Sequence, residues 1–325
     1  MILLAALLGC AAILLCGCSA AGNPLVKAEA TAVPGLSMTL HAAAASESNA
    51  DELSATLYFR YMDQPMLAAE SRALTVPRDE SAELALINAL LEGPSAGHLE
   101  LTRLFPETVR VESVTARDGL LFVTFNQALL TDDGVPANWR QDAAWAAEAP
   151  RLRMLTIQSL VASITESFPY TGVQIMISGQ EDGQAGQRLD NGYFLSGQSG
   201  LSDPQLRNEA LLLTPQNTVQ CLLRAWQQRD YDTLYAYTAA SGANGEPRPL
   251  YEDFALSLDA CPTLTVYSVS AGSVSHDGAS AVLTVSLSLS REGAPIEIPA
   301  YPLRLARENG VWKIGYDTLS SLMAS

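Results

Sequence analysis

Apolar residues recur at strand and helix spacing in two stretches of the chain, and the first stretch opens with an extended segment at 55–61. A helix is predicted next, because Asp79 or Ser81 can cap its start and Gly93-Pro94 ends it. Between these limits the apolar residues repeat at helical spacing, which gives the helix one apolar face. They are Leu84, Ile87, Leu90 and Leu91.

Two β-prone runs at 108–114 and 120–125 follow, joined by Asp118-Gly119. This pair indicates a tight hairpin, because both central positions of such a turn favour positive φ. A second helix and an alternating strand at 173–177 complete the stretch. The helix has its apolar residues at Ile157, Leu160, Val161, Ile164 and Phe168. The order β-α-β-β-α-β predicts an α+β fold with two helices on one face of a small sheet.

Two parts of this first stretch, 53–200, do not fit that pattern. Residues 131–150 look like an insertion before the second helix, and residues 183–200 form a polar, glycine-rich tail. A linker at 201–213 then separates it from the second stretch.

The second stretch, 214–325, begins with helices and ends with strands. Thr214-Pro215 provides a helix cap followed by proline at the first helical position, and Asp230 introduces a short second helix. Asn309-Gly310 predicts a tight hairpin between the last two of four β-prone runs. These runs lie at 263–270, 279–290, 296–307 and 311–316. We therefore predict helices packed on a long antiparallel sheet.

The N-terminal residues form an apolar run that ends at Leu15-Cys16-Gly17-Cys18. This ending resembles a bacterial lipobox, which implies a signal peptide at 1–17, cleavage before Cys18 and a diacylglyceryl group on its thiol. Residues 1–26 hold no charge, so the usual basic segment of a secretory signal is missing. An uncleaved N-terminal anchor and a buried helix are the alternatives. Residues 18–52, rich in Ala and Ser, are predicted to be a flexible tether.

Composition narrows the class of protein. The chain has 325 residues, 48% of them hydrophobic, which is enough for two folded domains. Its formal net charge of −16 repels nucleic acid, so nucleic-acid binding is excluded. If Cys10 and Cys16 leave with the signal peptide, the remaining free thiols are Cys221 and Cys261. An exported domain permits a disulfide between them, and two separate buried thiols are the equal alternative.

No group of residues has the spacing of a catalytic or metal site, so we expect no cofactor, no metal and no catalytic residue. The histidines are predicted to be exposed loop residues: His41, His98 and His276. Asp132-Asp133-Gly134 lacks the rest of a calcium loop and is predicted to be a turn. Gly183, Gly186 and Gly192 do not follow a strand, so they do not form a phosphate loop.

A few residues leave two interpretations open. Asp230 and Asp232 fit either an acid/base pair or the start of a helix, where carboxylates cap amides and favour the positive end of the helix dipole. Trp226, Tyr235 and Trp312 fit either the lining of a pocket or the core.

Ordered motifs across 53–200 resemble the GerMN domain of sporulation and spore-germination lipoproteins. The motifs are Leu57-Tyr58-Phe59, Leu90-Leu91-Glu92-Gly93-Pro94, Leu104-Phe105-Pro106-Glu107-Thr108, the hairpin from Val114 to Phe125, and Leu160 through Phe168-Pro169 to Ile175. The resemblance implies an envelope protein related in fold to ring-building modules of sporulation complexes, and it implies no catalytic residues. The pattern of 215–322, with Glu308-Asn309-Gly310-Val311-Trp312-Lys313-Ile314 near its end, resembles the nuclear-transport-factor-2-like, cystatin-like cone.

These observations lead to a functional hypothesis: a non-enzymatic protein, lipid-anchored on the extracytoplasmic face of the membrane, that acts as a scaffold or assembly factor. Its expected partners are envelope or sporulation-complex proteins, or further copies of itself. The alternative is a binding protein that holds a small molecule or a cell-wall fragment in the pocket of the C-terminal cone.

Overall fold

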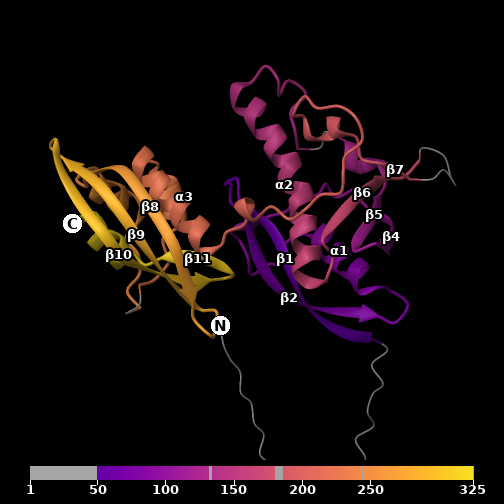
Figure 1. Cartoon of the computed structure of the whole chain (residues 1–325), viewed down its shortest axis with the longest axis horizontal. Coiled ribbons are helices and arrows are strands. Elements are labelled where there is room, and N and C mark those ends of the chain that lie inside the picture. The colour runs from indigo at the N-terminus through magenta and orange to yellow at the C-terminus, as the bar shows by residue number, and fades with distance from the viewer. Residues whose placement is uncertain (1–49, 132–133, 180–185, 243–244, 325) are drawn as a thin grey trace, which may run out of the picture. The chain divides into compact units, whose positions relative to one another are not determined.

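The computed structural model describes residues 50–131, 134–179, 186–242 and 245–324. We call residues 50–213 the N-terminal region and residues 214–324 the C-terminal region (Figure 1). Both contain helices and sheets, which confirms the α+β class. The predicted signal peptide at 1–17, Cys18 and nearly all of the tether lie outside the described residues.

Two sheets, not the single small sheet predicted, form the N-terminal region. One has the order β2-β1-β3 and the other the order β4-β5-β6-β7. The strands are β1 (Ala50–Tyr61), β2 (Leu67–Pro77), β3 (Leu101–Thr102), β4 (Val111–Arg117), β5 (Leu120–Phe125), β6 (Gly172–Ile177) and β7 (Gln187–Arg188). The strand β6 runs parallel to β5, and every other pair is antiparallel. Pattern analysis missed β2, β3 and β7, so the predicted order β-α-β-β-α-β was incomplete.

The first helix, α1 (Ala82–Glu92), has the predicted limits. The Ser81 hydroxyl accepts a hydrogen bond from the Leu84 amide, so Ser81, and not Asp79, is the cap. Gly93 ends the helix with φ of 96°, a conformation that glycine adopts without strain. The predicted apolar face is confirmed at Ile87 and Leu90, which are buried.

The second helix is longer than predicted. It is α2 (Ala143–Ser167), with Asp142 as its cap and Pro150 inside it. The predicted insertion at 131–150 was therefore partly wrong, because its second half is the start of α2. Short 3-10 helices stand at Gln127–Leu130, Asn191–Phe194 and Glu209–Leu211.

The predicted linker at 201–213 is held against the N-terminal region. Gln158 on α2 donates to the Leu206 carbonyl at 3.1 Å and accepts from the Asn208 amide at 3.0 Å. Gln205 and Val173 of β6 exchange backbone hydrogen bonds. Leu213 donates to the Leu67 carbonyl of β2 at 2.8 Å. These bonds fix the segment along α2, β6 and β2.

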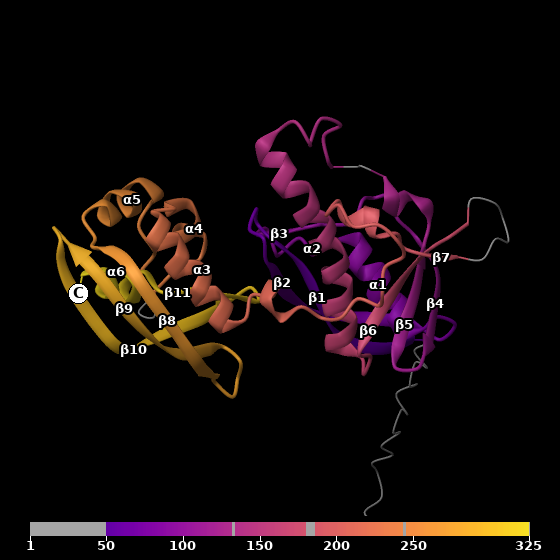
Figure 2. The same ribbon diagram turned by 45° about the horizontal axis from the view of Figure 1, so that its top comes forward.

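The C-terminal region follows the predicted order of helices and then strands. Its sheet has the order β11-β10-β9-β8 with antiparallel neighbours, and α3, α4 and α5 lie on the same side of it (Figure 2). The strands are β8 (Thr263–Val274), β9 (Ser280–Arg291), β10 (Ala294–Glu308) and β11 (Val311–Ile314). The helices are α3 (Pro215–Gln228), α4 (Tyr231–Ala236), α5 (Tyr251–Asp259) and α6 (Tyr316–Ala324). Pattern analysis missed α5 and α6.

The predicted turns of both regions are confirmed by their backbone angles. Asp118 and Gly119 have φ of 52° and 76°, and Asn309 and Gly310 have φ of 49° and 84°. Positive φ at both central positions is what the tight hairpin requires. Thr214 caps α3 by accepting from the Asn217 amide at 3.2 Å.

The two regions share one hydrophobic cluster and several polar bonds. The Tyr61 hydroxyl at the end of β1 donates to the Ala236 carbonyl at 2.6 Å, and its ring lies 5.4 Å from that of Tyr237. Lys313 on β11 forms an ion pair with Glu100. These contacts join the end of β1 and the segment before β3 to α4 and β11.

Candidate functional site

Charged and polar side chains gather where β2 passes the loop after α1. Glu70 is 1% exposed, and its carboxylate accepts from the Arg72 guanidinium at 2.7 Å and from the Ser95 amide at 3.1 Å. Arg72 also donates to the carbonyls of Ala89 and Gly93 at 3.3 and 2.9 Å. Since the last turn of α1 has no basic residue of its own, Arg72 supplies the positive charge that its carbonyls favour.

Ser95, His98 and Glu70 have the residue types of a hydrolytic triad, so their geometry decides whether they can act as one. The Ser95 hydroxyl lies 2.9 Å from His98 Nδ1, and the Glu70 carboxylate lies 3.8 Å from the same nitrogen. In a triad the nucleophile and the acid bind opposite nitrogens of the ring. Because both groups face Nδ1 here, the carboxylate does not orient the histidine as a base toward Ser95. The cluster instead holds the loop of residues 93–98 on β2.

The predicted exposure of the histidines holds for one of the two that the structure describes. His276 is exposed, whereas the His98 side chain is 22% exposed because it packs beside Glu70. His41 lies outside the described residues. Sequence analysis missed the Glu70 cluster because its members are far apart in sequence and occupy a strand that it did not predict.

Asp230 and Asp232 are both exposed. Asp230 caps α4, since its carboxylate accepts from the Thr233 amide at 3.1 Å and from the Thr233 hydroxyl at 2.7 Å. Of the two predicted alternatives, an acid/base pair and the start of a helix, Asp230 therefore takes the second. The geometry therefore gives no support to an acid/base pair at these residues.

The aromatic residues of the C-terminal region belong mainly to its core. Trp226 and Trp312 are 4% and 6% exposed, and the Trp226 indole donates to the Pro262 carbonyl at 3.1 Å. Tyr235 is half-buried between the Pro249 carbonyl, to which it donates at 3.1 Å, and the Arg248 guanidinium, 3.8 Å from its ring centre.

Cys221 and Cys261 are free thiols, so the disulfide alternative is not formed in this structure. The two residues have different surroundings: Cys221 is half-buried on α3 near Tyr237, and Cys261 follows α5, where its thiol donates to the Ser257 carbonyl at 3.4 Å. Burial raises the pKa of both thiols, which disfavours the reactive thiolate.

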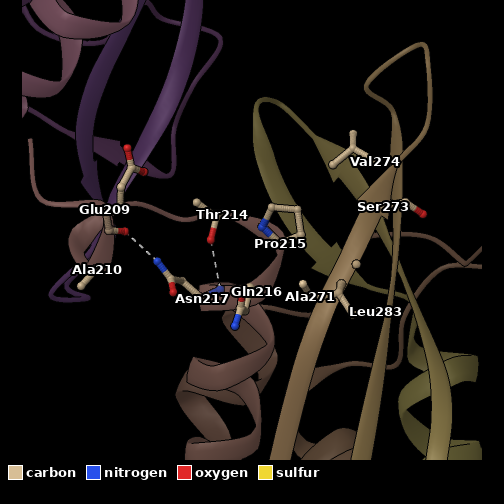
Figure 3. A pocket seen from close by; sticks show the side chains of 11 residues that line it. Glu209, Ala210, Thr214, Pro215, Gln216, Asn217, Ala271, Ser273, Val274 and Leu283 are labelled. Atoms are coloured by element: carbon tan, nitrogen blue, oxygen red, sulfur yellow. Dashed lines mark hydrogen bonds between the residues drawn. The ribbon is translucent and has the colours of Figure 1, made fainter. Parts of the chain in front are cut away.

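A pocket of about 430 Å³ lies between the first turn of α3 and the second half of β8 (Figure 3). Pro215, Val274 and Leu283 give it apolar walls, and Asn217 bonds to the Glu209 carbonyl at 2.8 Å. Glu209 is the one ionisable residue of its lining and is paired with Arg207 at 2.6 Å. The pocket therefore offers no pair of groups for proton transfer.

Other glycine and metal predictions have simple outcomes. Gly192 belongs to a 3-10 helix capped by Asp190, and Gly186 packs close to Thr124, so neither forms a phosphate loop. Asp132, Asp133 and Gly183 lie outside the described residues. Within the described ranges, no three His, Cys, Asp or Glu side chains are arranged to hold a metal ion.

None of the helices that the structure describes is long and apolar enough to span a membrane.

Sheet edges are the remaining surfaces with unpaired backbone groups. On the side opposite β2, the end of β1 pairs with β3, and the part before it is covered by Ser159, Ser163 and Ser167 of α2, which we call the serine row. The Tyr58 amide donates to Ser163 at 2.9 Å, and the Ser159 hydroxyl donates to the Tyr58 carbonyl at 2.5 Å. The spacing of four residues places these serines on one side of the helix, a signal that was present in the sequence.

The edge strands β4, β11 and β8 differ in their protection. The strand β4 contains Glu112 and Arg117. The edge of β11 is covered, because Ile314 and the segment 237–239 exchange backbone bonds of 2.9 and 2.8 Å. The strand β8 has no charged residue along its 12 positions. Charges and covering segments are the usual means by which proteins block edge-to-edge pairing, so β8 is the least protected of the three.

Comparison with known proteins gives a family match within the N-terminal region. The family model described as "Germane: Sporulation and spore germination" matches residues 56–183. The tandem GerMN domains of the sporulation protein GerM from Bacillus subtilis align with 18% identity and a TM-score of 0.31, over 51% of this chain and 48% of that one. The chain thus spans about half of that structure.

A second solved structure, described as a presumptive lipoprotein from Clostridium perfringens, aligns with 20% identity and a TM-score of 0.27, over 49% of this chain and 88% of that one. No curated protein gives a significant match. The family match covers β1 through β6 and both helices of the N-terminal region. Residues 56–183 are thus similar to the sporulation and spore germination family, which supports a GerMN-like domain in this part of the chain.

Proposed function

We propose that this protein is a lipid-anchored component of the cell envelope that acts in sporulation or spore germination through contacts with other proteins. The observation that supports this proposal most strongly is the family match over residues 56–183. The match relates the chain to sporulation and germination proteins, and the scaffold mechanism is our extension of it.

The surfaces of the molecule are consistent with a role in protein binding. The titratable cluster around Glu70 is occupied in holding a loop on β2. The exposed edges of β4 and β8, in contrast, present backbone donors and acceptors that an added strand can bind. We therefore assign partner binding to the sheet edges.

Cys18 and the tether of residues 18–52 supply the proposed anchor. A diacylglyceryl group provides two acyl chains, which is enough for stable attachment to a membrane. Attachment raises the local concentration of the folded regions toward other anchored proteins, and so strengthens weak contacts without any new interface.

The C-terminal region has the helices and the four-stranded antiparallel sheet that a nuclear-transport-factor-2-like cone requires, and we propose that fold for it. The alternative function, binding of a small molecule or cell-wall fragment inside the cone, has less support. Trp226 and Trp312 pack into the interior, where such a ligand would have to lie.

Crosslinking in growing and in sporulating cells, followed by affinity purification of the full chain, tests the proposal. We expect sporulation-stage envelope proteins in the crosslinked fraction. Cys18→Ala is the matched variant, because it removes the acyl site and leaves the folded regions unchanged. It is expected to leave the membrane fraction and to lose those partners. Recovery of no envelope protein from either culture contradicts the scaffold role, and unchanged membrane retention of Cys18→Ala contradicts the anchor.

A further inference from the structure

The strand β8 is the last strand of its sheet and has one side that pairs with no other strand. It pairs with β9 along one side, and its other side is the edge of the sheet. Register shifts between Leu264 and Val266 and between Ser270 and Ser273 divide it, which leaves Val266 to Ser270 as a regular central segment. The Val266 side chain at the start of this segment is 64% exposed.

Backbone groups along this central segment have no second partner in the structure. The Gln227 side chain on α3 donates to the Thr265 carbonyl at 2.8 Å, and that contact covers the edge just before Val266. Among the residues that the structure describes, only those of β9 form backbone hydrogen bonds with residues 266–270. An incoming strand therefore meets free donors and acceptors over the length of a short strand.

The distribution of charge favours a second copy of the chain at this edge. The whole chain has a formal net charge of −16, so two copies repel each other over most of their surfaces. The strand β8 contains neither a charged residue nor a proline. It is therefore a place where two copies can approach without bringing like charges together.

We propose that two copies of this protein bind each other through β8, antiparallel and about a two-fold axis at Ser268. In this register Ser268 lies opposite its own copy, Val266 lies opposite Ser270, and Tyr267 lies opposite Val269. The two four-stranded sheets become one continuous sheet, and the contact is self-complementary as a two-fold interface requires. This goes beyond the proposed function, because it needs neither the membrane anchor nor a sporulation partner.

The exposed side of the sheet accommodates the pairing. Val266, Ser268 and Ser270 alternate with residues that face α3, and all three are exposed. On the opposite side Tyr267 and Val269 are half-buried, so the second copy extends a surface that is already partly apolar. Each central side chain thus gains a cross-strand neighbour of compatible chemistry.

Disulfide trapping of the full chain, purified in nonionic detergent, tests the register. Residues directly opposite in an antiparallel pair have Cα atoms about 4.5 to 5.5 Å apart, which is within the range of a disulfide. Under mild oxidation Ser268→Cys is expected to give a covalent dimer. The matched control is Ser286→Cys, which is also exposed but lies on β9, the neighbouring strand. We expect about tenfold more dimer from Ser268→Cys than from this control or from the parent chain.

A second variant separates pairing from random collision. Val266→Lys introduced into Ser268→Cys places a charge on the edge and is expected to reduce the dimer to the control level. Val282→Lys, on the same exposed side but on β9, is expected to leave the dimer intact. Equal dimer yields from Ser268→Cys and Ser286→Cys, or dimers that Val266→Lys does not reduce, overturn the proposal. A purified chain that stays monomeric while cells still yield envelope partners overturns this inference alone and leaves the proposed function standing.

Discussion

The strand β1 of the N-terminal region and the strand β8 of the C-terminal region differ in how their free backbone groups are covered. In the N-terminal region the serine row of α2 binds the backbone of Tyr58, so the edge of β1 is used inside the fold. In the C-terminal region the central part of β8 has no such cover. The difference indicates that the serine row beside β1 serves the stability of the fold, whereas the backbone groups of β8 stay available to another chain.

Buried charges follow the same division. Arg60, Glu70 and Arg153 are buried in the N-terminal region, and Arg60 and Arg153 donate to backbone carbonyls of nearby loops. In the described part of the C-terminal region, Lys313 is the one buried charged residue. We therefore expect the replacement of buried charged or polar side chains to lower the unfolding free energy more in the N-terminal region than in the C-terminal region.

The largest effect is expected at Glu70. Glu70→Ala removes the buried carboxylate that binds the Arg72 guanidinium and the Ser95 amide, and it leaves both donors without that partner. Losing one member of a buried ion pair costs about 3 kcal/mol of unfolding free energy. Urea unfolding followed by circular dichroism measures the change. The control is Glu107→Ala, which breaks an exposed pair with Arg103 and should cost less than about 1 kcal/mol. Equal costs for the two variants contradict the structural role given to the cluster.

The serine row is expected to come next. Ser163→Ala leaves the buried Tyr58 amide without its acceptor, and an unsatisfied buried donor costs about 2 kcal/mol. Thr165→Ala is the matched control, because the Thr165 hydroxyl bonds only to carbonyls of its own helix. Its cost should be below about 1 kcal/mol. The measurement is the urea concentration at the midpoint of unfolding of both variants. If Ser163→Ala has the same midpoint as the control, the stability of β1 does not depend on the serine row.

Sequence analysis predicted correctly the features that depend on residues close in sequence, and it missed those that depend on distant residues. Local signals predicted the cap at Thr214 and the turns at Asp118-Gly119 and Asn309-Gly310, because each depends on neighbours within a few residues. They narrowed the cap of α1 to two candidates, of which the structure shows Ser81. The strand β2 was missed because its charged residues, Glu70 and Arg72, are typical of an exposed loop. Their partners lie in α1 and in the loop that follows it, and the sequence does not show these contacts.

The start of α2 was missed for a related reason. Pro150 usually marks the end of a helix, yet here it lies in the third turn, where helical packing outweighs the missing amide. The Glu70 cluster and the open edge of β8 both depend on which strands become neighbours. Neither property can be obtained from local spacing alone.

A smaller effect is expected at Lys313 in the C-terminal region. Lys313→Met keeps the length of the side chain and removes a charge that is paired with Glu100. Because the Glu100 side chain is 28% exposed, water can solvate its carboxylate after the change. We expect the unfolding free energy to change by less than about 1 kcal/mol, because the carboxylate left behind is partly solvated and the buried position keeps a side chain of similar length. Urea unfolding is the measurement, with wild type as the reference. A loss as large as that of Glu70→Ala removes the contrast between the two regions.

The smallest effect is expected at Tyr170, whose hydroxyl donates to Glu83 at 2.7 Å near the surface of the N-terminal region. Burial and this carboxylate raise its pKa to about 12 from 10.0. The folded protein therefore keeps the phenol proton at pH values where the unfolded chain has lost it, so stability falls as the pH rises from 10 to 12. Tyr170→Phe should lose this part of the pH dependence. The difference in tyrosinate absorbance between wild type and Tyr170→Phe should have a midpoint near 12, and Glu83→Gln should lower it. A midpoint that Glu83→Gln leaves unchanged shows that burial alone raises this pKa.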